Sequence, residues 1–183
     1  FFRIKKASSL LAGISVMQKN SALKELIINI RNSSEELIEV NKKDVENALN
    51  KNFSSAIIDR LTLTPNRILE MIKNLEQVII LEDPLGKILS EWKRPNGLHF
   101  QKITVPLGVI GIIYESRPNV TIDASATTMK AGNAVILKAG KDSFHTSLNL
   151  KDIVCKSFST AGLPENVVQM AESRKRESVD EML

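Results

Sequence analysis

The chain has 183 residues, of which 43% are hydrophobic and 25% are charged, and these proportions are typical of a folded globular protein. Its one cysteine excludes a disulfide framework and a cysteine-rich zinc module, and its two histidines leave little for a metal site, so we expect no metal. The 25 basic and 21 acidic side chains are spread evenly and only 4% of residues are aromatic, which argues against a nucleic-acid partner. No apolar run approaches the roughly 20 residues that cross a bilayer, so we expect no membrane segment and a cytoplasmic setting.

The first eighty residues have helical periodicity. One helix is predicted to begin near Asn20, because apolar residues follow at spacings of three and four: Leu23, Leu26, Ile27 and Ile30. Ser33 and Glu36 form a capping-box pattern that predicts another helix start. A further start is predicted at Thr64, with Pro65 at the first helical position and a buried face of Ile68, Ile72, Leu75 and Ile79. We interpret these stripes as core and not as a binding groove.

The pattern changes to alternation between residues 87 and 105. The turn sequence Arg94-Pro95-Asn96-Gly97 separates two extended runs, and Asn-Gly in that position is a strong hairpin signal. Little adjacent sequence is available to cover such a hairpin. Two interpretations therefore remain open, an arm that pairs with another subunit and a plain surface hairpin.

From Pro106 onward, strands and helices alternate. The nearly continuous apolar run at residues 109–114 predicts a strand that is buried on both faces. The segments that follow predict a helix, a strand, a helix, a strand and a helix at 119–130, 134–137, 147–160, 167–170 and 177–183. Successive units of this kind indicate an α/β fold with a parallel sheet.

Polar residues follow the first of these strands, in the run Glu115-Ser116-Arg117-Pro118-Asn119. The carboxyl end of a parallel strand, leading into a helix N-terminus, is where α/β sheets bind ligands. Arg117 is suited to a carboxylate or a phosphate. The alternative is that Asn119 only caps the helix and that Arg117 only forms a surface ion pair.

The second strand ends in Lys138-Ala139-Gly140-Lys141. Two lysines around a glycine suggest a phosphate group held near the backbone, although a solvated loop has the same composition. The Gly-x-Gly-x-x-Gly dinucleotide fingerprint is absent. Cys155, in the middle of a predicted helix, is interpreted as a small buried apolar side chain and not as a nucleophile.

Two stretches of the sequence resemble the signature of the γ-glutamyl phosphate reductase family, also called glutamate-5-semialdehyde dehydrogenases, within the aldehyde dehydrogenase superfamily. They are Val105–Thr121, which contains Tyr114-Glu115-Ser116-Arg117-Pro118-Asn119, and Lys130–Lys141. Shorter similar segments lie at 41–46, 60–63 and 176–179, so the resemblance spans nearly the whole chain. Most members of the wider superfamily carry Pro-Trp-Asn near Asn119, which makes the first stretch specific.

The resemblance implies an aldehyde dehydrogenase-like fold. Residues 1–82 would form the N-terminal helical part of the cofactor domain, 83–105 an oligomerisation hairpin, and 106–183 the first βα units of an NADP-binding Rossmann-like domain. The implied activity is NADPH-dependent reduction of L-glutamyl 5-phosphate to L-glutamate 5-semialdehyde, in proline biosynthesis. The implied partners are this small-molecule substrate, NADP(H) and further copies of the chain, which meet through the 87–105 hairpin.

The chemistry that the resemblance implies needs a cysteine thiolate, which attacks the acyl phosphate and releases phosphate, after which a hydride from NADPH reduces the thioester. In the family this cysteine follows the third βα unit, and Cys155 does not match its position. We therefore expect an N-terminal fragment that lacks the catalytic domain and is inactive by itself. The alternatives are a truncated nucleotide-binding or subunit-interaction module and a part of a bifunctional proline-synthesis synthase.

The resemblance also implies roles for single residues. Lys138 matches the superfamily lysine that reaches the adenosine ribose, and Tyr114 and Gly140 are assigned to the same cofactor site. Lys141 replaces the usual glutamate, which favours a 2′-phosphate and hence NADP over NAD. The oxyanion-holding asparagine falls within 116–119, where spacing points to Arg117 and residue type points to Asn119. We assign this catalytic role to Asn119, and substrate binding to Ser116 and Arg117.

Overall fold

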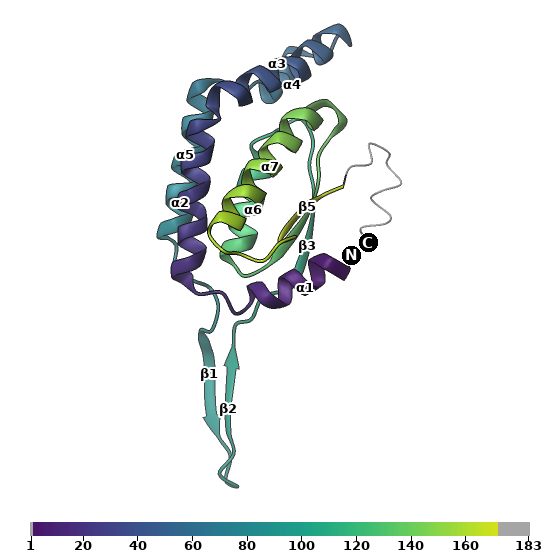
Figure 1. Ribbon diagram of the computed structural model, residues 1–183. Coiled ribbons are helices and arrows are strands. Elements are labelled where there is room, and N and C mark those ends of the chain that lie inside the picture. The colour runs from purple at the N-terminus through teal and green to yellow at the C-terminus, as the bar shows by residue number, and fades with distance from the viewer. Residues whose placement is uncertain (1, 172–183) are drawn as a thin grey trace.

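The computed structural model describes residues 2–171 (Figure 1). Five helices come first: α1 (Phe2–Leu11), α2 (Val16–Asn32), α3 (Ser34–Asn50), α4 (Ser55–Leu61) and α5 (Pro65–Ile80). A hairpin of β1 (Ile88–Lys93) and β2 (His99–Ile103) follows. The remaining elements are β3 (Val109–Ile113), α6 (Val120–Lys130), β4 (Ala134–Lys138), the 3₁₀ turn η1 (Lys141–Ser143), α7 (Phe144–Thr160) and β5 (Val168–Met170). The expected α/β architecture is confirmed, while the predicted helix at 177–183 lies outside the described residues.

Strands β3, β4 and β5 form a parallel sheet in that order, with Val109 opposite Ala134 and Val135 opposite Val168. Both crossovers run in the same direction, so α6 and α7 pack side by side on one face. Helix α1 packs against β3 and β4, on the face of the sheet opposite to α6 and α7 (Figure 1). Four of the five β4 residues are buried, all except Ile136, as expected for a central strand.

The prediction that the first strand is buried on both faces was wrong. Gly111 and Ile113 are exposed, and Ile113 retains 56% of its accessible surface. The reason is the strand order, because β3 pairs only with β4 in the described part of the chain. An apolar run in the sequence indicates a buried strand, but it does not indicate whether that strand lies at the edge of the sheet.

The N-terminal helices and the sheet share one apolar core. Helices α2 and α3 pack on α7, and α5 packs on α2 and α6 (Figure 1). Leu23 and Leu26 of α2 and Val154 of α7 are fully buried in this core. The interpretation of the apolar stripes as core is therefore confirmed, although Ile79 at the end of its stripe is only half-buried.

Local caps set the helix boundaries. Thr64 caps α5 as predicted, since its hydroxyl accepts a hydrogen bond from the Arg67 backbone N–H at 3.2 Å. Helix α2 begins at Val16, earlier than predicted, because Ser15 accepts from the Gln18 N–H. Ser33 lies at the start of α3 but makes no side-chain capping bond, so the predicted capping box is wrong.

The hairpin projects away from the helices and the sheet (Figure 1). Its turn is closed by a bond from the Arg94 N–H to the Leu98 carbonyl at 2.9 Å, and Gly97 adopts the positive φ of 85° that glycine tolerates. Trp92 stacks on Phe100 across the strands, with ring centroids 5.6 Å apart. All residues of both strands are exposed, so the expected hairpin is confirmed and nothing in residues 2–171 covers it.

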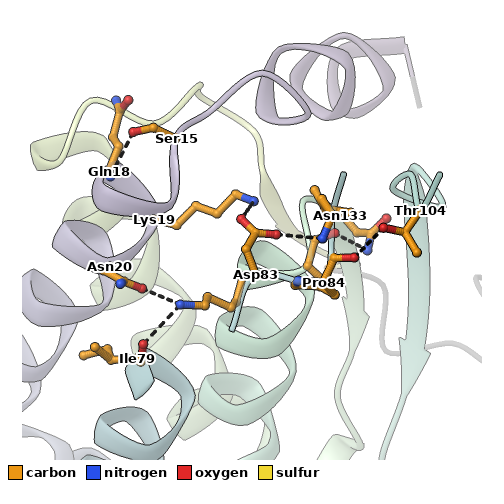
Figure 2. Close-up of polar contacts among 12 residues, drawn as sticks. Ser15, Gln18, Lys19, Asn20, Ile79, Asp83, Pro84, Thr104 and Asn133 are labelled. Atoms are coloured by element: carbon orange, nitrogen blue, oxygen red, sulfur yellow. Dashed lines mark hydrogen bonds and ion pairs between the residues drawn. The ribbon is translucent and has the colours of Figure 1, made fainter. Parts of the chain in front are cut away.

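A buried polar cluster holds the base of this hairpin (Figure 2). The Lys19 ammonium, only 1% exposed, donates to the Asp83 carboxylate at 2.9 Å, and the same carboxylate accepts from the Leu85 N–H. Lys130 donates nearby to Asn20, at 2.5 Å. Burial alone would raise the pKa of Asp83, but the bonds from Lys19 and Leu85 outweigh it and hold this pKa below its ordinary value.

Candidate functional site

The two loops that follow the carboxyl ends of β3 and β4 lie in contact with each other. The Tyr114 N–H extends the sheet by donating to the Lys138 carbonyl at 3.0 Å. Beyond that point Gly140 lies against the first loop so closely that a Cβ there would be 3.2 Å from the Glu115 Cα and 3.5 Å from the Ser116 nitrogen. The two segments that sequence analysis assigned to substrate and to cofactor are therefore neighbours.

The loop 115–119 has a fixed backbone. Ser116 adopts φ of 43°, a left-handed conformation that a residue with a side chain rarely takes and that costs roughly 1 kcal/mol. Backbone bonds follow immediately, from the Val120 N–H to the Arg117 carbonyl and from the Thr121 N–H to the Pro118 carbonyl. Strained backbone of this kind is concentrated at ligand sites, where it aims side chains in one direction.

Arg117 and Asn119 open into a cavity of about 290 Å³ between this loop and helices α4 and α5. Its floor is apolar, since Leu63 is 5% and Met71 2% exposed. Its rim is polar and carries both signs of charge. The other lining residues are Asp59, Arg60, Thr62, Arg67, Glu70 and Asn74.

One arginine of the rim, Arg67, is paired within the wall of the cavity. The Arg67 guanidinium forms a two-oxygen pair with the Asp59 carboxylate at 2.9 and 3.0 Å, and it also donates to the Thr62 carbonyl at 2.8 Å. Such forked pairs are geometrically specific. Arg67 therefore fixes the connection between α4 and α5.

Asn119 stands at the N-terminus of α6 but does not cap it with its side chain. Its amide donates instead to the Asp123 carboxylate at 3.1 Å. Burial raises the pKa of Asp123 above its ordinary value, while hydrogen bonds from Asn119 and Asn74 act in the opposite direction. Because a primary amide has two N–H groups, this bond orients Asn119 and leaves a second N–H for a ligand.

The cofactor candidates lie in the neighbouring segment and not in this cavity. Lys138 is 7% exposed at the end of β4, whereas Lys141 is exposed at the start of η1. The Tyr114 side chain points into the core, where its hydroxyl lies 2.6 Å from the Thr121 hydroxyl and burial raises its pKa. A cofactor role for Tyr114 stays a prediction, and this geometry restricts it to the main chain.

A buried hydrogen-bond network, called the brace below, joins the cavity wall to the first turn of α7, and no sequence pattern predicted it. Asn41 of α3, 2% exposed, donates to the Leu61 carbonyl at 2.9 Å and to the Thr146 hydroxyl at 3.1 Å, and its oxygen accepts from the Leu63 N–H. Asp44 accepts from both the backbone N–H and the hydroxyl of Thr146. The only signal for this brace was that residues 41–46 and 60–63 both belong to the resemblance.

Cys155 lies elsewhere. It sits within α7 facing β5, where its thiol approaches the Val168 carbonyl at 3.5 Å, and burial raises its pKa. It lines a different cavity, of about 500 Å³, together with residues 164–170. A partly buried thiol with a raised pKa is a poor nucleophile, in agreement with the interpretation of Cys155 as a packing residue.

Two further features bear on the kind of site. Within residues 2–171, no three histidine, cysteine, aspartate or glutamate side chains come together as metal ligands would. In the same range no helix combines the length and the apolar character that crossing a membrane requires.

The loop geometry, the parallel sheet and the projecting hairpin agree with comparisons to known proteins. The model of the aldehyde dehydrogenase family matches residues 4–183, and the chain belongs to that family. Solved aldehyde dehydrogenases share the fold at low identity, for example an acetylating aldehyde dehydrogenase from Geobacillus thermoglucosidasius with a TM-score of 0.72 at 13% identity, over 99% of this chain and 37% of that one.

Within that family the chain is similar to γ-glutamyl phosphate reductases. The protein of that name from Bartonella quintana is 45% identical over 99% of this chain and 44% of its own length. The crystal structure of the Thermotoga maritima protein superposes with a TM-score of 0.96 at 35% identity, again over 99% of this chain and 44% of that one. The Saccharomyces cerevisiae structure gives 0.89 at 30% identity, over 95% and 45%. The chain thus spans less than half the length of these relatives.

Proposed function

We propose that this chain supplies the cofactor-binding half, and part of the substrate site, of a protein that reduces L-glutamyl 5-phosphate to L-glutamate 5-semialdehyde with NADPH in proline biosynthesis. The observation that carries the proposal is the fixed loop 115–119, whose sequence resembles the γ-glutamyl phosphate reductase signature. The loop adjoins a cavity of mixed charge on one flank and the 138–141 segment on the other. The 45% identity to a reductase of that name supports the same activity.

The residues present fit an NADP cofactor. Gly140 has no side chain to separate the two loops, and Lys138 and Lys141 offer cations before and after it. We propose that Lys138 binds the ribose and that the exposed Lys141 binds the 2′-phosphate. When bound, the cofactor supplies the hydride.

The loop residues have separate roles in this proposal. The free N–H of Asn119 donates to the substrate carbonyl oxygen, where negative charge develops, and Asp123 keeps that amide oriented. Arg117 and Ser116 bind an acidic group of the substrate. The chemistry also needs a thiolate, and we propose that residues 1–183 alone are inactive because Cys155, the only cysteine, faces β5.

Reduction of NADP by L-glutamate 5-semialdehyde and phosphate, measured with the full-length gene product, tests this function. Activity that depends on phosphate and prefers NADP supports it. Absence of that activity in a folded protein that oxidises other aldehydes would refute it. Turnover by residues 1–183 alone would refute the proposed inactivity.

The Lys141→Glu variant tests the cofactor assignment separately. The substitution places a negative charge where a 2′-phosphate is proposed, so the preference for NADP over NAD should fall by about tenfold or more. Lys24→Glu, at an exposed position of α2, makes the same charge change on another element as a matched control and should leave the ratio unchanged.

We also propose that the hairpin joins copies of this chain and that the protein is cytoplasmic. Supporting the first point, Ile88, Trp92 and Phe100 remain 40–53% exposed although they are apolar. Sedimentation of the full-length protein should show an oligomer that Trp92→Lys dissociates. A monomeric wild type would refute this proposal.

A further inference from the structure

We propose that the cavity between α4, α5 and the 115–119 loop recognises the amino-acid end of the substrate, with Arg60 binding the α-carboxylate and Glu70 the α-ammonium group. This inference rests on the proposed function and deepens it. It assigns roles to residues that the sequence resemblance did not single out as site residues.

The first argument is the charge left on the rim after internal pairing. Arg67 and Asp59 neutralise each other in the forked pair described above. The charged rim residues that remain are Arg60, Arg117 and Glu70, two cations and one anion. A site for a plain phosphate would gain nothing from Glu70, whereas a zwitterionic head group matches a rim that carries both signs.

The second argument is the arrangement of polar and apolar surface within the cavity. Leu63 and Met71 form a buried apolar floor beneath the charged rim. An acyl chain of methylene groups with a charged head needs that combination, because burying its methylenes is favourable while its charges require partners. The volume of about 290 Å³ is near the lower end of the range for small-molecule pockets.

The third argument is position. Asn119, the proposed oxyanion donor, lines the same cavity as Arg60 and Glu70. A substrate whose head lies against α4 and α5 would therefore have its reacting carbonyl end toward the 115–119 loop. Arg117, on that loop, is then available for the phosphate, and Arg60 for the carboxylate.

Arg67 is a positioning residue in this arrangement. It contacts Asp59 and the Thr62 carbonyl, the residues on either side of Arg60 and Leu61. Holding that segment fixes the main chain from which the Arg60 side chain extends into the cavity.

A binding experiment tests the inference without turnover. L-Glutamate is titrated into the full-length gene product by calorimetry, beside glutarate, which lacks the ammonium group, and 4-aminobutyrate, which lacks the α-carboxylate. We expect both analogues to bind about tenfold or more weakly than L-glutamate. Glu70→Gln should abolish the preference over glutarate, and Arg60→Gln should abolish the preference over 4-aminobutyrate.

Matched controls lie on the same kinds of helix surface away from the cavity. Arg31 and Glu76 form an exposed pair between α2 and α5, so Arg31→Gln and Glu76→Gln should leave all three affinities unchanged. Equal binding of the three probes, binding of none, or equal effects of the cavity and control variants would overturn the inference.

A kinetic experiment separates this inference from the proposed function. In the NADP assay, Arg60→Gln should raise the KM for L-glutamate 5-semialdehyde about tenfold and leave the KM for NADP unchanged. An active wild type with unaltered variants would overturn the amino-acid site alone. Selective glutamate binding by a protein that is inactive in this assay would support the site and overturn the proposed reduction.

Discussion

Strand β4 and the hairpin strands β1 and β2 all carry apolar residues, yet they lie in opposite environments. In β4, Val135 and Leu137 are fully buried between helices, whereas Leu89 in β1 remains 60% exposed. The strand is held by tertiary burial, and the hairpin by its turn, its cross-strand pairs and its base. The difference indicates that the hairpin adds little to the stability of this chain by itself.

Substitutions where the hairpin joins the helices and the sheet should reduce the stability of the fold the most. Asp83→Asn leaves the buried Lys19 ammonium without a charge partner, and we expect a loss of about 4 kcal/mol in unfolding free energy. Urea denaturation measures it. Glu82→Gln, an adjacent exposed residue paired with Lys87, is the control and should change nothing measurable.

The same pair predicts a pH dependence. The folded-state pKa of Asp83 lies below its ordinary value, so its contribution is complete above about pH 4 and is lost as pH falls through the folded-state pKa. In Asp83→Asn this part of the acid sensitivity should vanish. An unchanged acid transition would contradict the role assigned to the pair.

Leucine truncations compare the two environments directly. Leu137→Ala in β4 should cost about 3 kcal/mol, because it removes buried methyl groups and leaves a cavity. Leu89→Ala in the hairpin should cost much less, since that side chain is already largely in water. Similar losses at both positions, measured by urea denaturation, would show that the hairpin is buried in solution.

Gly140→Ala should cost about 1 kcal/mol and weaken NADP binding more than it weakens folding. The residue has an ordinary φ of −63°, so any loss comes from the new methyl group pressing on the Glu115 backbone. Gly13→Ala is the control, because its added carbon would meet only the Leu10 carbonyl at 3.7 Å. Equal effects of the two variants on cofactor affinity would disprove the close-approach argument.

The smallest effect is expected at Trp92. Its stacking on Phe100 contributes about 0.5 kcal/mol, and Trp92→Ala should therefore barely shift the urea midpoint of the isolated chain. A loss as large as that of Leu137→Ala would mean that the hairpin is part of the cooperative fold.

Sequence patterns predicted the elements well where the cause is local. The cap at Thr64 and the turn at Asn96-Gly97 follow from short-range chemistry, and the structure confirms them. The parallel sheet, predicted from the alternation of strands and helices, is also confirmed. The exposed edge of β3 was not predicted, because strand order depends on residues far apart in the chain.

The candidate site shows the same limit. Arg117 and Asn119 stood out because they follow a strand. Arg60 and Glu70 did not, since they lie on helical segments more than forty residues away and only tertiary packing brings them to the same cavity. The bonds from Asn41 to Leu61 and Thr146 likewise join distant segments that no local pattern connects.

That brace has a mechanical consequence. Helix α3 holds the wall of the cavity through Asn41 and the first turn of α7 through Asp44, although it contributes no residue to the cavity lining. The cavity wall at Leu61 and Leu63 and the start of α7 at Thr146 are therefore held by the same helix. Substitutions of Asn41 or Asp44 would change the spacing between the cavity wall and the start of α7 without altering any residue that lines the cavity.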